Sequence, residues 1–228
     1  MMKDGGTVMS APYAPSVEPH PAPAGLIIRP FTHSDADYTA AVAITNQLFP
    51  EYPDTVDEWR FADENRSPHI KQERWLADLD GTPVAYSTYF HFEWMYHPQK
   101  FGILICVLPA YQGRGIGATL YNAILAELEP FNPIALRARV REDMQRGIKF
   151  ILDRSYQEDM REWESRLAVA TFDPAPYLGH EQTLRAEGIR IVTVADLLEH
   201  DPDCREKIWQ LDVELTRDVP SPEPHTPM

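Results

Sequence analysis

The stretch Gln112-Gly113-Arg114-Gly115-Ile116-Gly117 is the part of the sequence whose residue types and spacing best fit chemistry. Glycines at a strand-to-helix turn let backbone N–H groups point into one concavity without obstruction by a Cβ atom. The N-terminus of the following helix adds about half a positive charge. Together these features predict an anion site that suits a phosphate or pyrophosphate, to which Arg114 can add a charged contact.

The spacing of these glycines can be compared with three kinds of loop. A P-loop would place Lys followed by Ser or Thr after its last glycine, but Ala118 and Thr119 follow Gly117. A dinucleotide fingerprint has the spacing GxGxxG, whereas these glycines are spaced GxGxG and follow a run of strands. The third interpretation is a tight strand-to-helix turn that binds no ligand.

The elements beside the loop follow from the periodicity of the apolar residues. A continuous apolar run from Phe101 to Leu108 predicts a central strand buried on both faces. Apolar residues at helical spacing predict a helix from Gly115 to Glu129. Ahead of the loop, alternation of apolar and polar residues on both sides of Asp80-Gly81 predicts a hairpin.

The whole pattern predicts a mixed sheet. Strands joined by short turns imply an antiparallel meander, and the later strand–helix–strand units imply parallel or crossover pairing. The predicted fold class is therefore α/β, in the α+β sense of a mixed sheet that is not doubly wound. The predicted elements are strands at 26–31, 73–79, 84–96, 101–108, 134–140, 156–167 (an exposed edge) and 188–194, and helices at 34–49, 56–65, 115–129, 142–154, 175–187 and 194–217.

The motif at Gln112 to Gly117 resembles the signature Q/R-x-x-G-x-G/A of the GNAT (Gcn5-related N-acetyltransferase) superfamily of acyltransferases. The preceding Val107-Leu108-Pro109 and Tyr111 are similar to that family as well. The order of strands and helices from Leu26 to about Val194 is similar to the GNAT acyl-CoA N-acyltransferase fold. The resemblance implies direct transfer of an acetyl group from acetyl-CoA, as co-substrate, to the amine of a small molecule, without a metal.

The resemblance also implies how the cofactor is held. The loop would bind the CoA pyrophosphate, and the strand at 105–107 would splay from the strand at 136–140 to admit the pantetheine arm. One free backbone N–H near Val107 would polarise the thioester carbonyl. The cofactor-binding residues implied in this way are Ile105, Cys106, Val107, Gln112, Gly113, Arg114, Gly115, Ile116 and Gly117.

The sequence departs from the family at three positions that often carry polar catalytic groups. Ile151 stands where many members have a Tyr general acid, Met144 near a frequent Asn, and Phe101 near a general-base Glu. The transfer needs only a neutral amine and a well-placed carbonyl, so water relays can serve. The catalytic residues are therefore unknown from the sequence.

Replacement bases can be named without choosing among them. Glu51 and Tyr52 fall in the loop between the first two helices, and Glu142 begins the helix after the strand at 134–140. Glu93 and His91 share one face of the strand at 84–96. Each of these is also explained as a solvated or hydrogen-bonded structural residue. Cys106 lies in an apolar strand and is expected to be a small core residue rather than a nucleophile.

Composition excludes several other functions. The chain of 228 residues carries 35 Asp and Glu against 21 Lys and Arg, for a formal net charge of −14, which argues against binding to nucleic acid or anionic membrane. Its acidity weakly favours a cationic acceptor. The sequence shows no long apolar run that predicts a membrane span, and no CxxC or HExxH motif that predicts a metal. Two cysteines are too few for a disulfide framework, so a cytoplasmic protein is expected.

The sequence divides into three segments. Residues 1–25 are predicted to be a disordered Pro-rich leader, 26–195 the GNAT acetyltransferase domain, and 196–228 an acidic helical extension with a Pro-rich tail. The apolar residues of the extension predict that its helix, about 202–217, docks on the domain or on a second copy, while the end after Val219 stays mobile.

The extension also resembles the connector of tandem GNAT proteins, so the chain is similar to their N-terminal half. A homodimer or a second GNAT domain is the expected partner. The alternative function is a catalytically weak or inactive acyl-CoA-binding regulatory domain, to which the three apolar positions point. A third interpretation, an interaction module that uses only the fold, predicts no acetyl-CoA binding.

Overall fold

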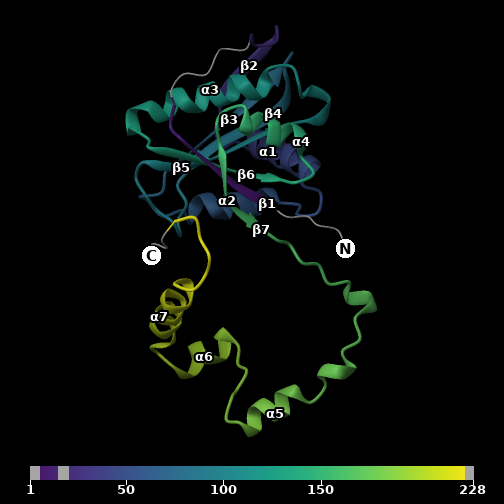
Figure 1. Ribbon diagram of the computed structural model, residues 1–228, viewed down its shortest axis with the longest axis vertical. Helices are drawn as coiled ribbons and strands as arrows, with labels where there is room; N and C mark the ends of the chain where they lie inside the picture. The colour runs from purple at the N-terminus through teal and green to yellow at the C-terminus, as the bar shows by residue number, and fades with distance from the viewer. Residues whose placement is uncertain (1–5, 15–20, 224–228) are drawn as a thin grey trace.

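The computed structural model describes residues 6–14 and 21–223, and its centre is a seven-stranded mixed sheet (Figure 1). The strand order is β2-β3-β4-β5-β6-β1-β7. The strands are β1 (Gly6–Pro12), β2 (Leu26–Pro30), β3 (Gln72–Leu79), β4 (Thr82–Phe90), β5 (Lys100–Val107), β6 (Ala135–Arg141) and β7 (Gln157–Glu162). The helices are α1 (Asp35–Leu48), α2 (Val56–Glu64), α3 (Ile116–Leu128), α4 (Gln145–Leu152), α5 (His180–Ala186), α6 (Val194–His200) and α7 (Cys204–Thr216).

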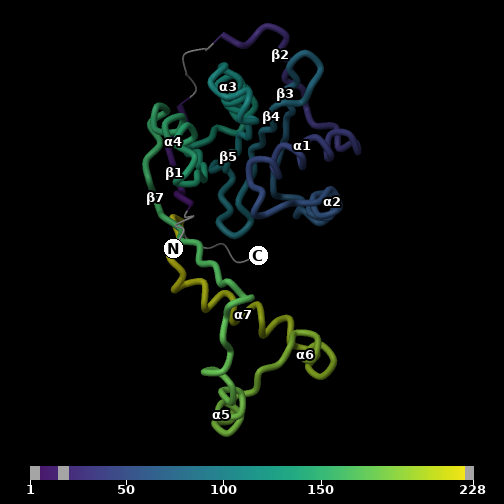
Figure 2. The backbone as a smooth tube through the Cα atoms, turned by 90° about the vertical axis from the view of Figure 1, so that its right-hand side faces the viewer, coloured from purple at the N-terminus to yellow at the C-terminus, as the bar shows by residue number. Residues whose placement is uncertain are grey.

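Helices cover both faces of the sheet, as Figure 2 shows: α1 and α2 lie on one side and α3 and α4 on the other. On the α3/α4 side, one core joins the apolar face of α3 to Phe101, Ile103, Leu136 and Ala138. On the α1/α2 side, a smaller core surrounds Tyr86. The predicted mixed sheet, with its antiparallel meander from β3 to β5, is confirmed, and β2 pairs antiparallel with β3.

The parallel strands β5 and β6 pair over only part of their length. Their register runs from Lys100 opposite Ala135 to Ile103 opposite Ala138. Both strands continue beyond that point, to Val107 and Arg141, without pairing to each other. A gap therefore opens between them toward the end of β5 that leads into the glycine loop.

The N-terminal segment corrects the predicted disordered leader. Gly6–Pro12 is β1, which lies between β6 and β7 and pairs antiparallel with both. Met9 and Ala11 point into the α3/α4-side core, which explains why this short strand is held despite the prolines after it. The predictions for residues 1–5 and 15–20 lie outside the described residues.

Residues 163–223 leave β7, pass through α5, α6 and α7, and return to the sheet as an open strap (Figure 1). The predicted strand at 188–194 is wrong, because no residue there pairs with the sheet in the described part of the chain. The predicted helix at 194–217 is two helices separated at 201–203. Within the described residues, no helix is both long enough and apolar enough to cross a membrane.

The structure differs from the predicted mobile tail and from one of the two predicted docking sites of the helix, its own domain. The apolar side chains of α7 are 37–58% exposed at Ile208, Trp209, Leu211 and Leu215, so α7 does not dock on its own sheet. The tail after Val219, predicted to be mobile, returns to the sheet through Ser221 and Glu223. Polar contacts fix it there, which a pattern of prolines does not reveal.

Candidate functional site

The loop between β5 and α3 has the geometry of an anion site. Gly113 and Gly115 have φ of 77° and 85°, the left-handed region that glycine adopts without strain. Gly115 is the N-cap of α3 and provides no side-chain cap. The first-turn N–H groups of a helix have no intrahelical partner, so those of α3 are available to an anion.

The side chains of the loop stabilise its shape. Gln112 donates from Nε2 to the carbonyl oxygen of Val107 at 2.9 Å. Arg114 donates to the carbonyl oxygen of Ala110 at 2.9 Å and lies over the Tyr111 ring. Arg114, expected to contact the anion, therefore folds back on the loop in this structure.

Arg146 is a cation at the loop that the sequence did not indicate. Its Nη1 lies 3.5 Å from the position that a Cβ of Gly113 would take. Arg146 belongs to α4, 33 positions from Gly113 in the sequence, so only the packing of α4 beside α3 reveals the contact. Basic residues in the first turn of a helix are electrostatically unfavourable, which was the one available signal.

The gap beyond Ile103 is lined differently on its two sides. Ile105 and Val107 pack toward α3 and α4, where Phe150 lies 3.6 Å from the position that a Cβ of Gly117 would take. Cys106 points to the α1/α2 side and is buried. Burial raises the pKa of its thiol to about 12, which agrees with a core residue rather than a nucleophile.

The three positions expected to lack polar catalytic groups are apolar in their surroundings too. Ile151 is buried in the α3/α4-side core, and Met144 packs against the same core from the N-cap of α4. Phe101 is fully buried and stacks on His91 with ring centroids 4.4 Å apart. None of the three supplies a proton donor or acceptor.

The candidate bases separate into two places. Glu51 accepts a hydrogen bond from Arg141 Nη1 at 3.0 Å, and Glu142 pairs with Arg161 at 3.2 Å, so both lie near the end of β6 where the gap opens. Glu93 lies in the connection from β4 to β5, at the opposite end of β5 from the glycine loop. The structure thus brings Glu51 and Glu142 toward the gap and leaves Glu93 away from it.

Two further candidates are held by structural contacts. His91 is buried, and its Nδ1 accepts from the Lys71 backbone N–H at 3.2 Å. Desolvation lowers the pKa of His91, which favours the neutral ring. Tyr52 interacts with Glu164, and this hydrogen bond raises the pKa of its hydroxyl.

A pair of buried hydroxyls between α3 and α4 also escaped sequence reasoning. Tyr121 and Tyr156 have hydroxyl oxygens 3.4 Å apart, next to the Phe150 ring. Burial raises the pKa of both, so both stay protonated at neutral pH. Each is a proton donor on the same side of the sheet as Ile105 and Val107.

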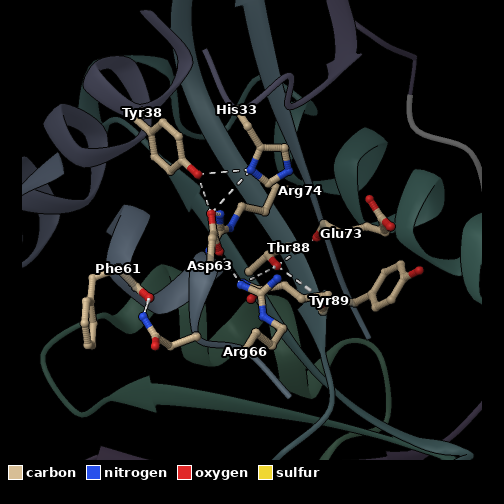
Figure 3. Close-up of polar contacts among 11 residues, drawn as sticks. His33, Tyr38, Phe61, Asp63, Arg66, Glu73, Arg74, Thr88 and Tyr89 are labelled. Carbon is tan, nitrogen blue, oxygen red and sulfur yellow. Dashed lines mark hydrogen bonds and ion pairs between the residues drawn. The ribbon is translucent and has the colours of Figure 1, made fainter. Parts of the chain in front are cut away.

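A separate polar cluster on the α1/α2 side is structural (Figure 3). Asp63 of α2 accepts hydrogen bonds from Tyr38 at 2.6 Å and from Arg74 of β3 at 2.5 Å, and it also pairs with Arg66. Burial alone would raise the pKa of Asp63, but the bonds from Arg74 and Tyr38 outweigh it and lower the pKa to about 2. The cluster ties α2 and α1 to the sheet.

Comparison with known proteins agrees with this fold. The sequence model of the Acetyltransferase (GNAT) family matches residues 38–154, which contain β3 to β6, the glycine loop and α4. The chain therefore belongs to the GNAT acetyltransferase family, and its sheet is the GNAT acyl-CoA N-acyltransferase fold. No curated protein matches the chain.

Two solved structures illustrate the likeness. One is a tandem GNAT protein from the clavulanic acid biosynthesis pathway, solved without acetyl-CoA, with 17% identity and a TM-score of 0.56 over 71% of this chain and 52% of that one. The other is a GCN5-related N-acetyltransferase from Sphaerobacter thermophilus, with 18% identity and a TM-score of 0.55 over 71% of this chain and 50% of that one. The chain spans about half the length of both, and at this identity the likeness is one of fold.

Proposed function

We propose that the protein is an acetyl-CoA-dependent N-acetyltransferase that moves an acetyl group directly to the amine of a small molecule. The observation that carries the proposal is the junction at Val107, where the gap between β5 and β6 meets the uncapped N-terminus of α3. In the described part of the chain, the backbone of β5 beyond Ile103 has no strand partner on its β6 side, so it is available to pair with an extended chain. The loop suits a pyrophosphate. The two are continuous along the backbone.

The residues present fit the cofactor. Backbone N–H groups from Gly113 to Gly117 would hold the pyrophosphate, with Arg146 beside them. The strand backbone from Leu104 to Val107 would hold the pantetheine arm and polarise the acyl carbonyl. When bound, acetyl-CoA supplies an activated acyl group as a thioester.

The acceptor amine must be neutral to attack, and the nearby carboxylates differ as bases. The backbone N–H of Glu51 and the guanidinium of Arg141 lower the pKa of the Glu51 carboxyl. A carboxylate with a lowered pKa is a weaker proton acceptor, so Glu51 suits this task less well. Glu142 is the other carboxylate near the gap, and it pairs with Arg161.

Isothermal titration with acetyl-CoA, followed by an assay of CoA release with a panel of amines, tests the proposal. We expect binding in the micromolar range and release that depends on an amine. Absence of acetyl-CoA binding by the folded chain would refute it.

A second candidate is an acyl-CoA-binding regulatory domain without turnover. The apolar residues Ile151, Met144 and Phe101 favour it, because no proton donor or acceptor stands at those positions. Tight acetyl-CoA binding with no CoA release on any amine would support this alternative.

The expected partner is a second GNAT domain or a second copy of the chain. The exposed apolar side chains of the strap support this, since such a surface favours burial. Both cysteines of the chain are free and buried, which fits a protein of the cytoplasm.

A further inference from the structure

Strand β6 presents a row of arginines on the α1/α2 side of the sheet. Leu136, Ala138 and Val140 point into the α3/α4-side core. Side chains alternate along a strand, so Arg137, Arg139 and Arg141 point to the opposite side. Lys100 of β5 joins them, because its Nζ reaches the same carboxylate as Arg137.

The cations of this row have different partners. Arg139 pairs with Glu162 of β7 at 2.6 Å. Arg141 pairs with Glu51 at 3.0 Å and with Asp143 at 2.7 Å.

Lys100 and Arg137 share one carboxylate from the tail. Glu223 Oε1 lies 2.7 Å from Lys100 Nζ and 2.6 Å from Arg137 Nη2. Among the described residues, no other carboxylate is hydrogen-bonded to either cation, although Asp159 lies 3.7 Å from Arg137 Nε. This pair of cations therefore depends on Glu223.

Arg137 is a deeply buried cation whose close partner is the Glu223 carboxylate of the tail. The residue is 5% exposed, and its Nε is buried without a hydrogen bond in the described part of the chain. A buried charge is costly unless it is paired. If the Glu223 side chain moves away, Lys100 and Arg137 form a binding site for another carboxylate, and this pair of cations is called the seat.

The position of Glu223 allows its side chain to separate from Lys100 and Arg137. It lies at the end of the strap, whose helix α7 has exposed apolar side chains and stands away from the sheet (Figure 2). Within residues 219–223, the other side-chain hydrogen bond to the body of the domain is a weak one, from Ser221 Oγ to Met95 Sδ at 3.1 Å. Detaching the tail thus breaks few interactions besides those of the Glu223 carboxylate.

The seat lies beside the gap. Arg137 is opposite Gly102, one residue before the last β5–β6 pair, Ile103 with Ala138. Gly102 lies two residues before Leu104, the first residue of β5 beyond the pairing with β6. Two residues along a strand span about 7 Å, which is the length of a small amino acid derivative. An amine at the opening of the gap and a carboxylate at the seat fit one small molecule.

We propose that Lys100 and Arg137 bind a carboxylate of the acceptor, so that the substrate is an amine that also carries a carboxylate, and that Glu223 occupies this seat in its absence. The inference rests on the proposed acetyltransferase function and names its substrate class. The two positive charges of Lys100 and Arg137 favour an acceptor with a carboxylate, whereas the net charge of −14 of the whole chain favours a cationic acceptor.

Glutarate binding to the full chain tests the seat directly, with Glu223→Ala as the variant that empties it. We expect Glu223→Ala to bind glutarate at least tenfold more tightly than the unaltered protein, by isothermal titration. Lys100→Met in the Glu223→Ala background should remove this gain, and the neutral diamide of glutarate should not bind. Glu214→Ala is the matched control, because it removes a carboxylate of the same strap that pairs locally with Arg217, the C-cap of α7.

The acceptor side is tested by CoA release with amino carboxylates and their carboxamides. We expect the carboxamides to lose at least tenfold in kcat/KM, and Glu223→Ala to lower KM for the acids only. No gain in glutarate affinity would overturn the proposal, and a fall in Tm without that gain would identify Glu223 as a clasp for the tail. Acetyl-CoA titration of the same variants separates the outcomes, since loss of acetyl-CoA binding concerns the proposed function and not the seat.

Discussion

Gly115 and Gly117 differ in backbone conformation, and the difference decides which substitution tests the loop. Gly115 has a φ of 85°, so any side chain there strains the backbone as well as the site. At Gly117, a Cβ would meet Phe150 at 3.6 Å and Val107 at 3.8 Å, which are ordinary contacts. Gly117 therefore accepts a side chain without a general loss of structure.

Gly117→Glu is expected to lower acetyl-CoA affinity at least tenfold, or about 1.4 kcal/mol, because a carboxylate would stand where the pyrophosphate binds. The fold should survive, since an anion at a helix N-terminus is electrostatically favourable. Gly117→Ala is the control for the added Cβ and should bind nearly as well as the unaltered protein. Equal affinity of the Glu and Ala variants by titration would remove the pyrophosphate assignment.

The buried carboxylate of Asp63 should make the stability of the protein depend on pH. Its pKa falls from 3.8 to about 2 on folding, which corresponds to about 2 kcal/mol of stability. A depressed folded pKa means that this stability is present above the unfolded value, near pH 4, and is lost as pH falls toward 2. Asp63→Asn should therefore destabilise the protein at pH 7 by about 2 kcal/mol or more, in urea unfolding, and much less near pH 2.

Glu64→Gln is the matched control, because Glu64 is the exposed neighbour of Asp63 on α2. It should change the free energy of unfolding by less than about 0.5 kcal/mol. If Asp63→Asn costs no more than this control at pH 7, the cluster of Figure 3 does not hold α2 to the sheet.

Strand β1 joins the N-terminal segment to the far side of the sheet, and one buried side chain anchors it. Met9 is 4% exposed in the core between β6 and α3. Met9→Lys should cost about 3 kcal/mol or more, because it buries an unpaired charge. Pro12→Lys, at the exposed end of the same strand, should leave Tm nearly unchanged. A Tm for Met9→Lys equal to that of Pro12→Lys would mean that β1 is not integral to the sheet.

The strap is expected to determine the oligomeric state of the whole molecule. Its exposed apolar side chains on α7 find no cover in the sheet, so a second copy of the chain is the expected cover. Truncation after Asp201, between α6 and α7, should halve the mass in light scattering. Because it also removes the Glu223 carboxylate that pairs with Lys100 and Arg137, Tm should fall only as far as it does in Glu223→Ala. A larger fall in Tm without a change in mass would show packing of α7 in cis, and a Tm equal to that of Glu223→Ala with an unchanged mass would identify a passive linker.

The sequence alone determined those features that depend on near neighbours. Glycine spacing after a buried strand predicted the loop, because Gly113 and Gly115 are needed at positive φ wherever the chain turns this sharply. Periodicity placed α3 within one residue at each end, since its apolar stripe has the helical repeat. The resemblance to the GNAT signature was carried by the same local stretch and is confirmed by the family match.

Only the tertiary structure decided what depends on distant parts of the chain. Proline-rich surroundings hid β1, whose pairing partners on β6 are more than 120 residues away. Arg146 reaches the glycine loop through helix packing, and Glu223 meets Arg137 across 86 positions. Such contacts leave no periodic trace, because burial and charge pairing at those positions arise when the sheet assembles and not from the local backbone.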